Sequence, residues 1–262
     1  MKSGYHVVYA RDYLEGIHDA RAYGFDFAQF ELGVPTFYLD GLSAARLREI
    51  RDCAQGNGVE LTFHAPGDNV SLYADYPHVR QGNLEQFRRI LDKANTLRAR
   101  HMTVHAGDFS SFKQNGGRGD VFGETFAAYY EDVLCENLRE VLKSAGDVLI
   151  CLANYKLSAV GMRAAQRLIE EGQPLPLTLD AAKPYDCEFY CGNKSAIREM
   201  HIHDCGEAYG SHQTVGTGSV DFGLFRQFCG PEVYLNFEVR PVEEAAKSKL
   251  ALEALWGKEY FR

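Results

Sequence analysis

The sequence lacks any apolar run long enough to cross a membrane. No stretch approaches the roughly 18 consecutive apolar residues that a transmembrane helix requires. The opening residues, MKSGYHVVYARDYLEG, also lack the apolar centre and the small-residue cleavage site of a secretory signal peptide. From these absences we expect a protein with no membrane partner and no secretory leader.

The sequence also has little that is typical of nucleic-acid-binding or disulfide-bonded proteins. Its 28 basic residues are outnumbered by 36 acidic ones, and the net charge of −8 disfavours nucleic acids and anionic membranes as partners. The 7 cysteines are odd in number, none forms a CxxC pair, and only Cys187 and Cys191 lie close in sequence. We therefore expect free thiols and a cytoplasmic location.

Strand-type and helix-type segments alternate along all 262 residues, with no linker or low-complexity segment between them. Apolar β-type runs predict strands at 5–9, 26–32, 59–65, 101–106, 147–153, 176–180, 198–203 and 233–239. Helical periodicity predicts helices at 12–23, 43–58, 77–98, 120–145, 158–172, 221–228 and 242–256, whereas 184–195 is expected to be a loop or short turn. Eight repeats without a change of pattern predict an α/β fold, a single (β/α)8 TIM barrel spanning residues 1–262.

Turn-rich stretches follow three of the predicted strands, at 65–77, 107–120 and 204–219. Loops that follow strands lie on the active face of a TIM barrel. We expect the second loop to be mobile and the glycine-rich third loop to close over a ligand.

Six of the predicted strands end in an acid or a histidine, namely Glu31, His64, His105, Asp180, His203 and Glu238. All strands of a TIM barrel finish at the same mouth, so these side chains are expected to converge there. Each alone is equally well a surface or capping group, but together they point to a metal site. Asp180, His203 and Glu238 offer carboxylate and imidazole ligands that suit one Mn, Co, Zn or Mg ion per chain. The fifth strand breaks the series with Ala153.

His64 and His105 are each followed by a small residue and a tight turn. A lone histidine on a strand is more often a core or surface group, but here either one would bind the ion, hydrogen-bond a substrate hydroxyl or act as acid and base near neutral pH. His212 opens a loop in which Gly216 and Gly218 permit a turn that exposes backbone N–H groups to an anion.

Four further residues near the strand ends have more than one interpretation. His201 faces the same side of its strand as His203 and is expected to support His203 or Asp180 from one layer deeper. Asp204 points the other way and is expected to cap the following turn, and Asn154 faces away from the mouth. Lys183 either pairs with a carboxylate, binds an anionic substrate group, forms a Schiff base or is a solvated loop residue.

Eight short motifs together resemble the xylose-isomerase-like barrel superfamily. They are FEL at 30–32, FHAP at 63–66, VHAG at 104–107, LANY at 152–155, LDAAKPY at 179–185, HIHD at 201–204, the run from His212 to Asp221, and NFEV at 236–239. The superfamily includes sugar epimerases of the tagatose/psicose type, hydroxypyruvate isomerase, inosose dehydratase and endonuclease IV. The resemblance covers nearly the whole chain.

The resemblance implies a divalent metal held by residues of strands five to eight. In the isomerases these are Glu, Asp, His and Glu, whose positions here hold Ala153, Asp180, His203 and Glu238. The two glutamates also form the acid/base pair of the epimerases, and Ala153 removes one of them. Ala153 reflects natural divergence, a deliberate replacement of glutamate, or an offset of the register. Endonuclease IV implies three zinc ions on nine positions, of which Ala153, Lys183 and Gly210 do not match, and this argues against DNA repair.

The leading hypothesis is a metal-dependent isomerase or epimerase of a sugar or sugar derivative. Glu238, or one of the histidines 64, 105 and 212, would remove the proton next to a carbonyl and give an enediolate, and a related lyase would use the same chemistry. The alternatives are a degenerate, non-catalytic sugar-binding barrel, suggested by Ala153 and Lys183, and a metal-dependent phosphodiesterase. Barrels of this kind often associate through their outer helices, so a homo-oligomer is compatible with the sequence.

Overall fold

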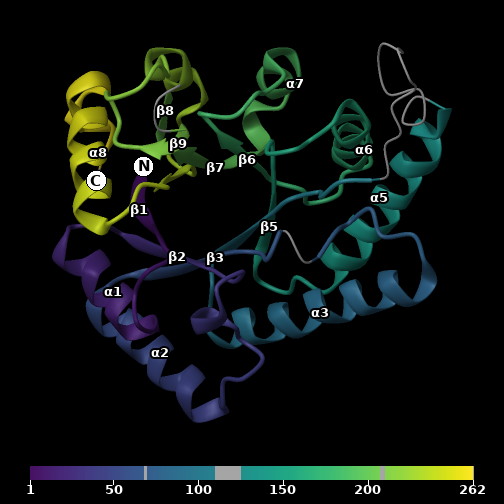
Figure 1. Cartoon of the computed structure of the whole chain (residues 1–262), viewed down its shortest axis with the longest axis horizontal. Helices are drawn as coiled ribbons and strands as arrows, with labels where there is room; N and C mark the ends of the chain where they lie inside the picture. Colours follow the sequence, from purple (N-terminus) through teal and green to yellow (C-terminus); the bar gives the residue numbers. More distant parts are fainter. Residues whose placement is uncertain (68–69, 110–124, 207–209, 262) are drawn as a thin grey trace.

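The computed structural model describes residues 1–67, 70–109, 125–206 and 210–261, and within them eight parallel strands close into a barrel. The strands are β1 Lys2–Val7, β2 Phe27–Glu31, β3 Glu60–His64, β4 His101–Val104, β5 Leu149–Ala153, β6 Leu177–Asp180, β7 Ile197–Ile202 and β10 Tyr234–Phe237. Their order around the barrel follows the sequence, and β10 closes it against β1 (Figure 1). A short antiparallel ribbon of β8 Asp204–Gly206 and β9 Gly210–Gln213 follows β7. The predicted TIM barrel is confirmed.

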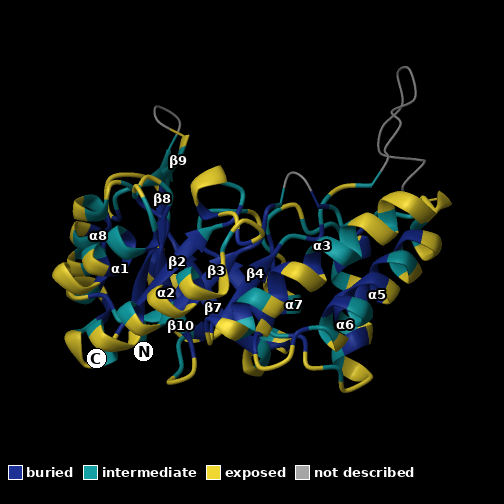
Figure 2. Cartoon of the chain, turned by 90° about the horizontal axis from the view of Figure 1, so that it is seen from below, coloured by how far each residue is buried: buried dark blue, intermediate teal, exposed yellow. Residues whose placement is uncertain are grey.

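Helices surround the barrel and bury one face each against the strands (Figure 2). They are α1 Tyr13–Ala22, α2 Ala44–Asn57, α3 Pro77–Thr96, α5 Ala127–Lys143, α6 Ala159–Glu170, α7 Cys187–Gly192 and α8 Val242–Trp256, with 3-10 turns η1 Pro35–Phe37, η2 Lys194–Ala196, η3 Phe222–Phe228 and η4 Lys258–Tyr260. No helix in the described part of the chain is long and apolar enough to cross a membrane.

Side-chain caps fix where several helices begin. Asp12, Ser43, Ser158 and Asp186 each accept a hydrogen bond from the backbone N–H three residues later, which satisfies a donor that the helix itself cannot pair. The predicted glycine stop after residue 57 is also present, because Gly58 takes the left-handed conformation with φ of 67°.

The element boundaries differ from the predictions in three places. The first strand starts at Lys2, because residues 2–5 pair with residues 234–237 of β10. The segment 184–195 contains a short helix instead of only a loop, since Asp186 caps it and Tyr190 is buried beneath it. The predicted helix at 221–228 is a 3-10 helix. Most of the predicted mobile loop at 107–120 lies outside the described residues, and so does the start of the predicted helix at 120–145.

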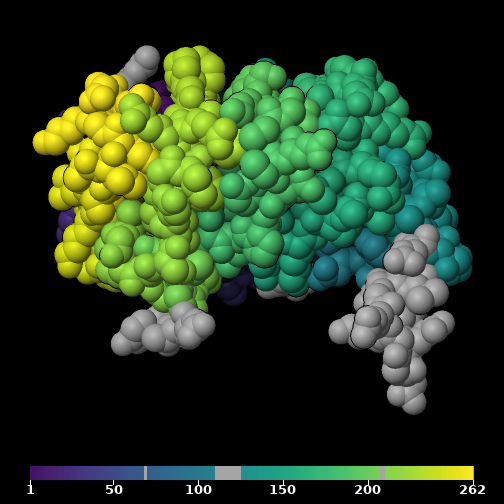
Figure 3. Space-filling view, turned by 90° about the horizontal axis from the view of Figure 1, so that it is seen from above, coloured from purple at the N-terminus to yellow at the C-terminus, as the bar shows by residue number. Residues whose placement is uncertain are grey.

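The two ends of the chain meet beside the closing strands. The N-terminal ammonium of Met1 donates to the carbonyl of Tyr260 at 2.8 Å, and α8 packs against both β1 and β10. The outer surface then runs without a break from α5 through α6 and α7 to α8 (Figure 3). The hydroxyl of Tyr23, at the end of α1, donates to Glu243 of α8 at 3.0 Å, so the ring of helices closes at the same point as the barrel.

The centre of the barrel is polar and is organised around one buried carboxylate, Glu199. Its oxygens accept hydrogen bonds or form ion pairs with Gln29, His101, Thr103, Thr178 and His201. Gln29 in turn accepts from Asn236 at 2.6 Å, so the network reaches from β2 to β10. Burial alone would raise the pKa of Glu199, but the charges of His101 and His201 hold it well below its usual value.

Replacing Glu199 with glutamine removes the charge that this network surrounds. We expect Glu199→Gln to lower the free energy of unfolding by about 3 kcal/mol, since the buried imidazolium of His201 loses one of its counter-charges. Urea denaturation measures the change. Glu232→Gln is the matched control, because Glu232 is exposed and has no ion pair among the described residues. Equal stabilities of the two variants would contradict the central role of Glu199.

Candidate functional site

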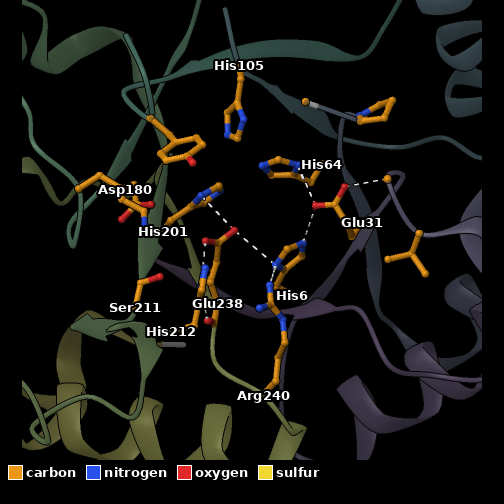
Figure 4. A pocket seen from close by; sticks show the side chains of 16 residues that line it. His6, Glu31, His64, His105, Asp180, His201, Ser211, His212, Glu238 and Arg240 are labelled. Atoms are coloured by element: carbon orange, nitrogen blue, oxygen red, sulfur yellow. Dashed lines mark hydrogen bonds and ion pairs between the residues drawn. The ribbon is translucent and has the colours of Figure 1, made fainter. Parts of the chain in front are cut away.

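A cavity of about 450 Å³ opens at the mouth where the barrel strands end (Figure 4). Its polar lining consists mainly of His6, Glu31, His64, His105, Asp180, Lys183, His201, His212, Glu238 and Arg240. The strand-end residues predicted to converge do so, and His203 lies buried just beneath, 3.3 Å from Asp180. The structure thus brings every predicted site residue to one end of the barrel.

Glu238 lies at the centre of this cavity among histidines. Its Oε1 is 3.2 Å from Nδ1 of His201 and 3.4 Å from Nδ1 of His6. Its Oε2 is 3.8 Å from Nδ1 of His212 and 4.0 Å from Nε2 of His203. Burial alone would raise the pKa of Glu238, but the nearby imidazoles, His201 first, lower it well below its usual range. Burial would likewise lower the pKa of His201, yet the carboxylates of Glu238 and Glu199 raise it to about 9. At neutral pH this pair is therefore a carboxylate and an imidazolium.

A second carboxylate–imidazole cluster stands across the mouth. Oε2 of Glu31 is 3.0 Å from Nδ1 of His64 and 3.3 Å from Nε2 of His6, and the backbone N–H of Gly33 donates to Oε1 at 2.7 Å. Burial opposes charge on His64, but the charge of Glu31 raises the pKa of His64 above its ordinary value. His6 bridges the two clusters, because its other nitrogen faces Glu238.

Asp180 and His203 provide the features of a metal site. Nε2 of His203 is buried with no hydrogen-bond partner among the described residues, and it lies 3.3 Å from Oδ1 of Asp180. Nδ1 of the same ring is 3.1 Å from the carbonyl of Asp204, the usual outer contact of a ligating histidine. Ligand atoms within 4.8 Å of one another form two triads that share Glu238: Asp180, His201 and Glu238, and His203, His212 and Glu238. The donor set therefore fits a divalent ion.

His105 and His212 are neutral members of the site. Burial lowers the pKa of His105 to about 3, helped by the charge of His64. Burial also lowers the pKa of His212, to about 4, although Glu238 opposes the shift. The ring of His105 lies edge-on to His64 at 4.7 Å and also contacts Tyr155 at 4.9 Å. At neutral pH both imidazoles are therefore uncharged, and each can form hydrogen bonds to a ligand.

Lys183 and Ala153 lie on the β5–β6 side of the mouth. Lys183 lines the cavity, and its ammonium is 5.4 Å from the centre of the Tyr155 ring. Ala153 is fully buried and pairs with Thr178 of β6, so β5 brings no polar side chain to the mouth. The next residue, Asn154, turns away as predicted, and its amide bonds both the backbone N–H and the carbonyl of Asp180.

The sequence prediction missed two lining residues and misjudged a third. His6 escaped notice because the first strand was placed too late, and Arg240 because it lies three residues beyond β10. Its guanidinium donates to Nδ1 of His6 at 2.7 Å. His201 was expected to support Asp180 or His203, but it pairs with Glu238 and Glu199 instead. The alternation of side chains along a strand correctly placed His201 on the inner face of β7, but it could not predict which carboxylate His201 would contact.

Asp204 caps the loop after β7, as predicted. Its carboxylate accepts hydrogen bonds from four backbone N–H groups, those of Cys205, Gly216, Gly218 and Val220, at 2.9 to 3.0 Å. A side chain at Gly218 would collide with the carbonyl of Cys205 and with Asp204 itself. The loop places His212 over the cavity, with its backbone nitrogen 3.0 Å from the same Nδ1 of His203 that faces the carbonyl of Asp204.

Similar solved structures share this fold at low sequence identity. D-psicose 3-epimerase from Clostridium cellulolyticum H10, with D-tagatose, is 18% identical and covers 99% of each chain with a TM-score of 0.72. A D-tagatose 3-epimerase-like protein is 19% identical, covering 99% of this chain and 97% of its own with a TM-score of 0.75. The IOLI protein with a bound zinc atom is 15% identical, covering 100% and 99% with a TM-score of 0.73.

A search of curated proteins finds no match to this sequence. By contrast, the model of one protein family, described as the xylose isomerase-like TIM barrel, matches residues 17–255. That match spans every barrel strand from β2 to β10 and all the strand-end residues of the cavity. The chain belongs to the xylose isomerase-like TIM barrel family.

Proposed function

We propose that this chain is a metal-dependent isomerase or epimerase of a sugar or sugar derivative. The observation that carries the proposal is the position of Glu238, a buried carboxylate that lines the cavity and lies within 4.8 Å of two sets of metal-ligating atoms. Membership of the family and the likeness to sugar epimerases in fold are consistent with it. The substrate would be a small sugar-like molecule.

Asp180, His203 and Glu238 would hold the ion; they are drawn from the two triads that share Glu238 and do not themselves form one of those triads. The unpaired Nε2 of His203 and the adjacent oxygen of Asp180 favour one ion from the group Mn, Co, Zn and Mg. A bound ion of this kind polarises a carbonyl and its neighbouring hydroxyl, which makes the intervening proton more acidic. The zinc atom of the IOLI protein is in keeping with such a site.

Proton transfer falls to the side chains around the substrate. Glu238 is a carboxylate at neutral pH, so it can take the proton from the carbon next to the carbonyl and give an enediolate. His64, whose pKa is raised by Glu31, is able to return a proton, whereas His105 and His212 are uncharged and would hydrogen-bond the substrate hydroxyls between which the proton moves. In this division His64 and His105 act side by side, because their rings are 4.7 Å apart, and His212 acts beside Glu238.

Ala153 supports one competing function. A strand end without a polar group gives the ion one protein ligand fewer, and a barrel with too weak a metal site would bind a sugar without converting it. Metal content separates the two functions.

Metal content of the purified protein is the first test. We expect about one divalent ion per chain by elemental analysis, and a tighter ion in Ala153→Glu, because the new carboxylate would add a ligand beside Asp180. Gln55→Glu, on the exposed surface of α2, adds the same charge far from the mouth and should leave metal binding unchanged. No ion in either the unaltered chain or Ala153→Glu would exclude the metalloenzyme and leave the binding barrel.

Proton transfer is tested by exchange with solvent. With Mn²⁺ present, we expect the chain to incorporate deuterium from D2O into ketoses such as D-tagatose at the carbon next to the carbonyl, as followed by NMR. Glu238→Gln should slow this exchange by at least about 100-fold, since it removes the proposed base. Glu188→Gln, an exposed position on α7, serves as the control. Exchange at the original rate in Glu238→Gln would rule out Glu238 as the base.

A further inference from the structure

Each carboxylate that lines the cavity lies against an imidazole. Glu31 lies against His64 and His6, and Glu238 against His201. Asp180 accepts the backbone N–H of Ala182 at 2.9 Å and faces His203. The side chain of Lys183, in contrast, makes no hydrogen bond or ion pair within the described residues, and its one polar attraction there is to the ring of Tyr155.

A second lysine, Lys156, also lies against the Tyr155 ring, and unlike Lys183 it forms an ion pair with a carboxylate. The ammonium of Lys156 lies 5.5 Å from the centre of the Tyr155 ring, and it also binds Oδ2 of Asp108 at 3.1 Å. Lys156 does not line the cavity, whereas Lys183 does. Two lysines therefore share one aromatic ring, and the one that faces the cavity is the one without a carboxylate.

The backbone around Lys183 is anchored, so the ammonium does not hang from a free loop. The amide of Asn154 donates to the carbonyl of Asp180 at 3.0 Å and to the carbonyl of Pro184 at 3.2 Å. The backbone N–H of Lys183 returns to the carbonyl of Asp180 at 3.4 Å. These hydrogen bonds tie the backbone on both sides of Lys183 to the end of β5. Less conformational entropy is therefore lost when an anion binds to Lys183.

The surroundings leave the charge of Lys183 available to a ligand. The adjoining strand β5 ends in Ala153, which offers no carboxylate, and the next histidine along the wall, His105, is half-buried beside the Tyr155 ring. Arg240, the other permanent cation of the cavity, also lacks a carboxylate partner among the described residues, but its guanidinium is held by Nδ1 of His6 at 2.7 Å, whereas the ammonium of Lys183 has no hydrogen bond there. Lys183 is thus the cation best placed to meet an incoming anion.

We propose that the substrate is a sugar acid, whose carboxylate binds Lys183 while its carbonyl end faces Glu238. This inference rests on the proposed function, because it takes the same cavity as the substrate site. A carboxylate fits better than a phosphate ester, since three carboxylates already line the cavity and a dianion would be repelled more strongly. Anionic sugars with a single negative charge are therefore the preferred substrates, ahead of neutral ketoses.

Binding measurements on three related probes test this assignment. D-fructuronate, D-fructose and D-fructose 6-phosphate differ in the group at one end of the sugar, and isothermal titration in Mn²⁺-containing buffer compares their affinities. We expect D-fructuronate to bind roughly tenfold more tightly than either of the others. Lys183→Met should remove this preference without changing the affinity for D-fructose, and Lys183→Arg should retain most of it.

Lys156→Met is the matched control, because it removes the other lysine from the same ring and should leave the preference intact. Thermal unfolding of each variant checks that it remains folded. Equal affinity of the unaltered chain for D-fructuronate and D-fructose would overturn the inference. So would a preference that survives Lys183→Met, or tighter binding of the phosphate ester.

Deuterium exchange on the same sugars separates this inference from the proposed function. If D-fructuronate binds through Lys183 but neither sugar exchanges protons with solvent, the substrate-class inference stands and the isomerase function fails. If D-fructose exchanges and binds as well as D-fructuronate, the isomerase function stands and the role of Lys183 is wrong.

Discussion

The chain of charges from Glu199 through His201 to Glu238 is the interaction on which the cavity depends. Glu199 has no contact with solvent, and its charge is compensated entirely by side chains of the barrel interior. One of those side chains, His201, reaches upward to Glu238, so the buried carboxylate stabilises an imidazolium, and the imidazolium stabilises a carboxylate at the cavity. The acid at the site is thereby fixed in charge and position by a residue one layer below it.

At the mouth of the barrel an uncharged side chain joins two carboxylates, because burial lowers the pKa of His6 and Arg240 donates to its Nδ1. His6 lies between Glu31 and Glu238, at 3.3 Å from one and 3.4 Å from the other, and so couples the clusters of β2 and β10. On the opposite side, β5 and β6 contribute Ala153, Asp180 and Lys183, and the ammonium of Lys183 has no carboxylate partner among the described residues. The polar side chains are therefore paired around Glu31 and Glu238, whereas a charge is left unpaired at Lys183, where a substituent of the ligand would lie.

The positions of the cavity-lining residues were predictable because the strands of a parallel barrel all end at the same mouth. Polar residues at the ends of apolar runs had to meet at one mouth, and Glu31, His64, His105, Asp180 and Glu238 do. Partners were less predictable: strand alternation puts His201 inside the barrel, but its contact with Glu238 depends on the register between β7 and β10. Glu199 carries the same period-two signal, two residues before His201, and its inward position was readable from that spacing.

The carboxylate of Asp204 determines the shape of the loop after β7. Four backbone amides of the loop donate to this one side chain, and Gly218 has no room for a side chain because it packs against Asp204. The loop residues that line the cavity, Ser211 and His212, are not among those four donors. The cavity-lining positions of the loop can therefore be substituted, in evolution or by design, while Asp204 holds the loop backbone in place. Ligand specificity could change in this way without a change in the loop conformation.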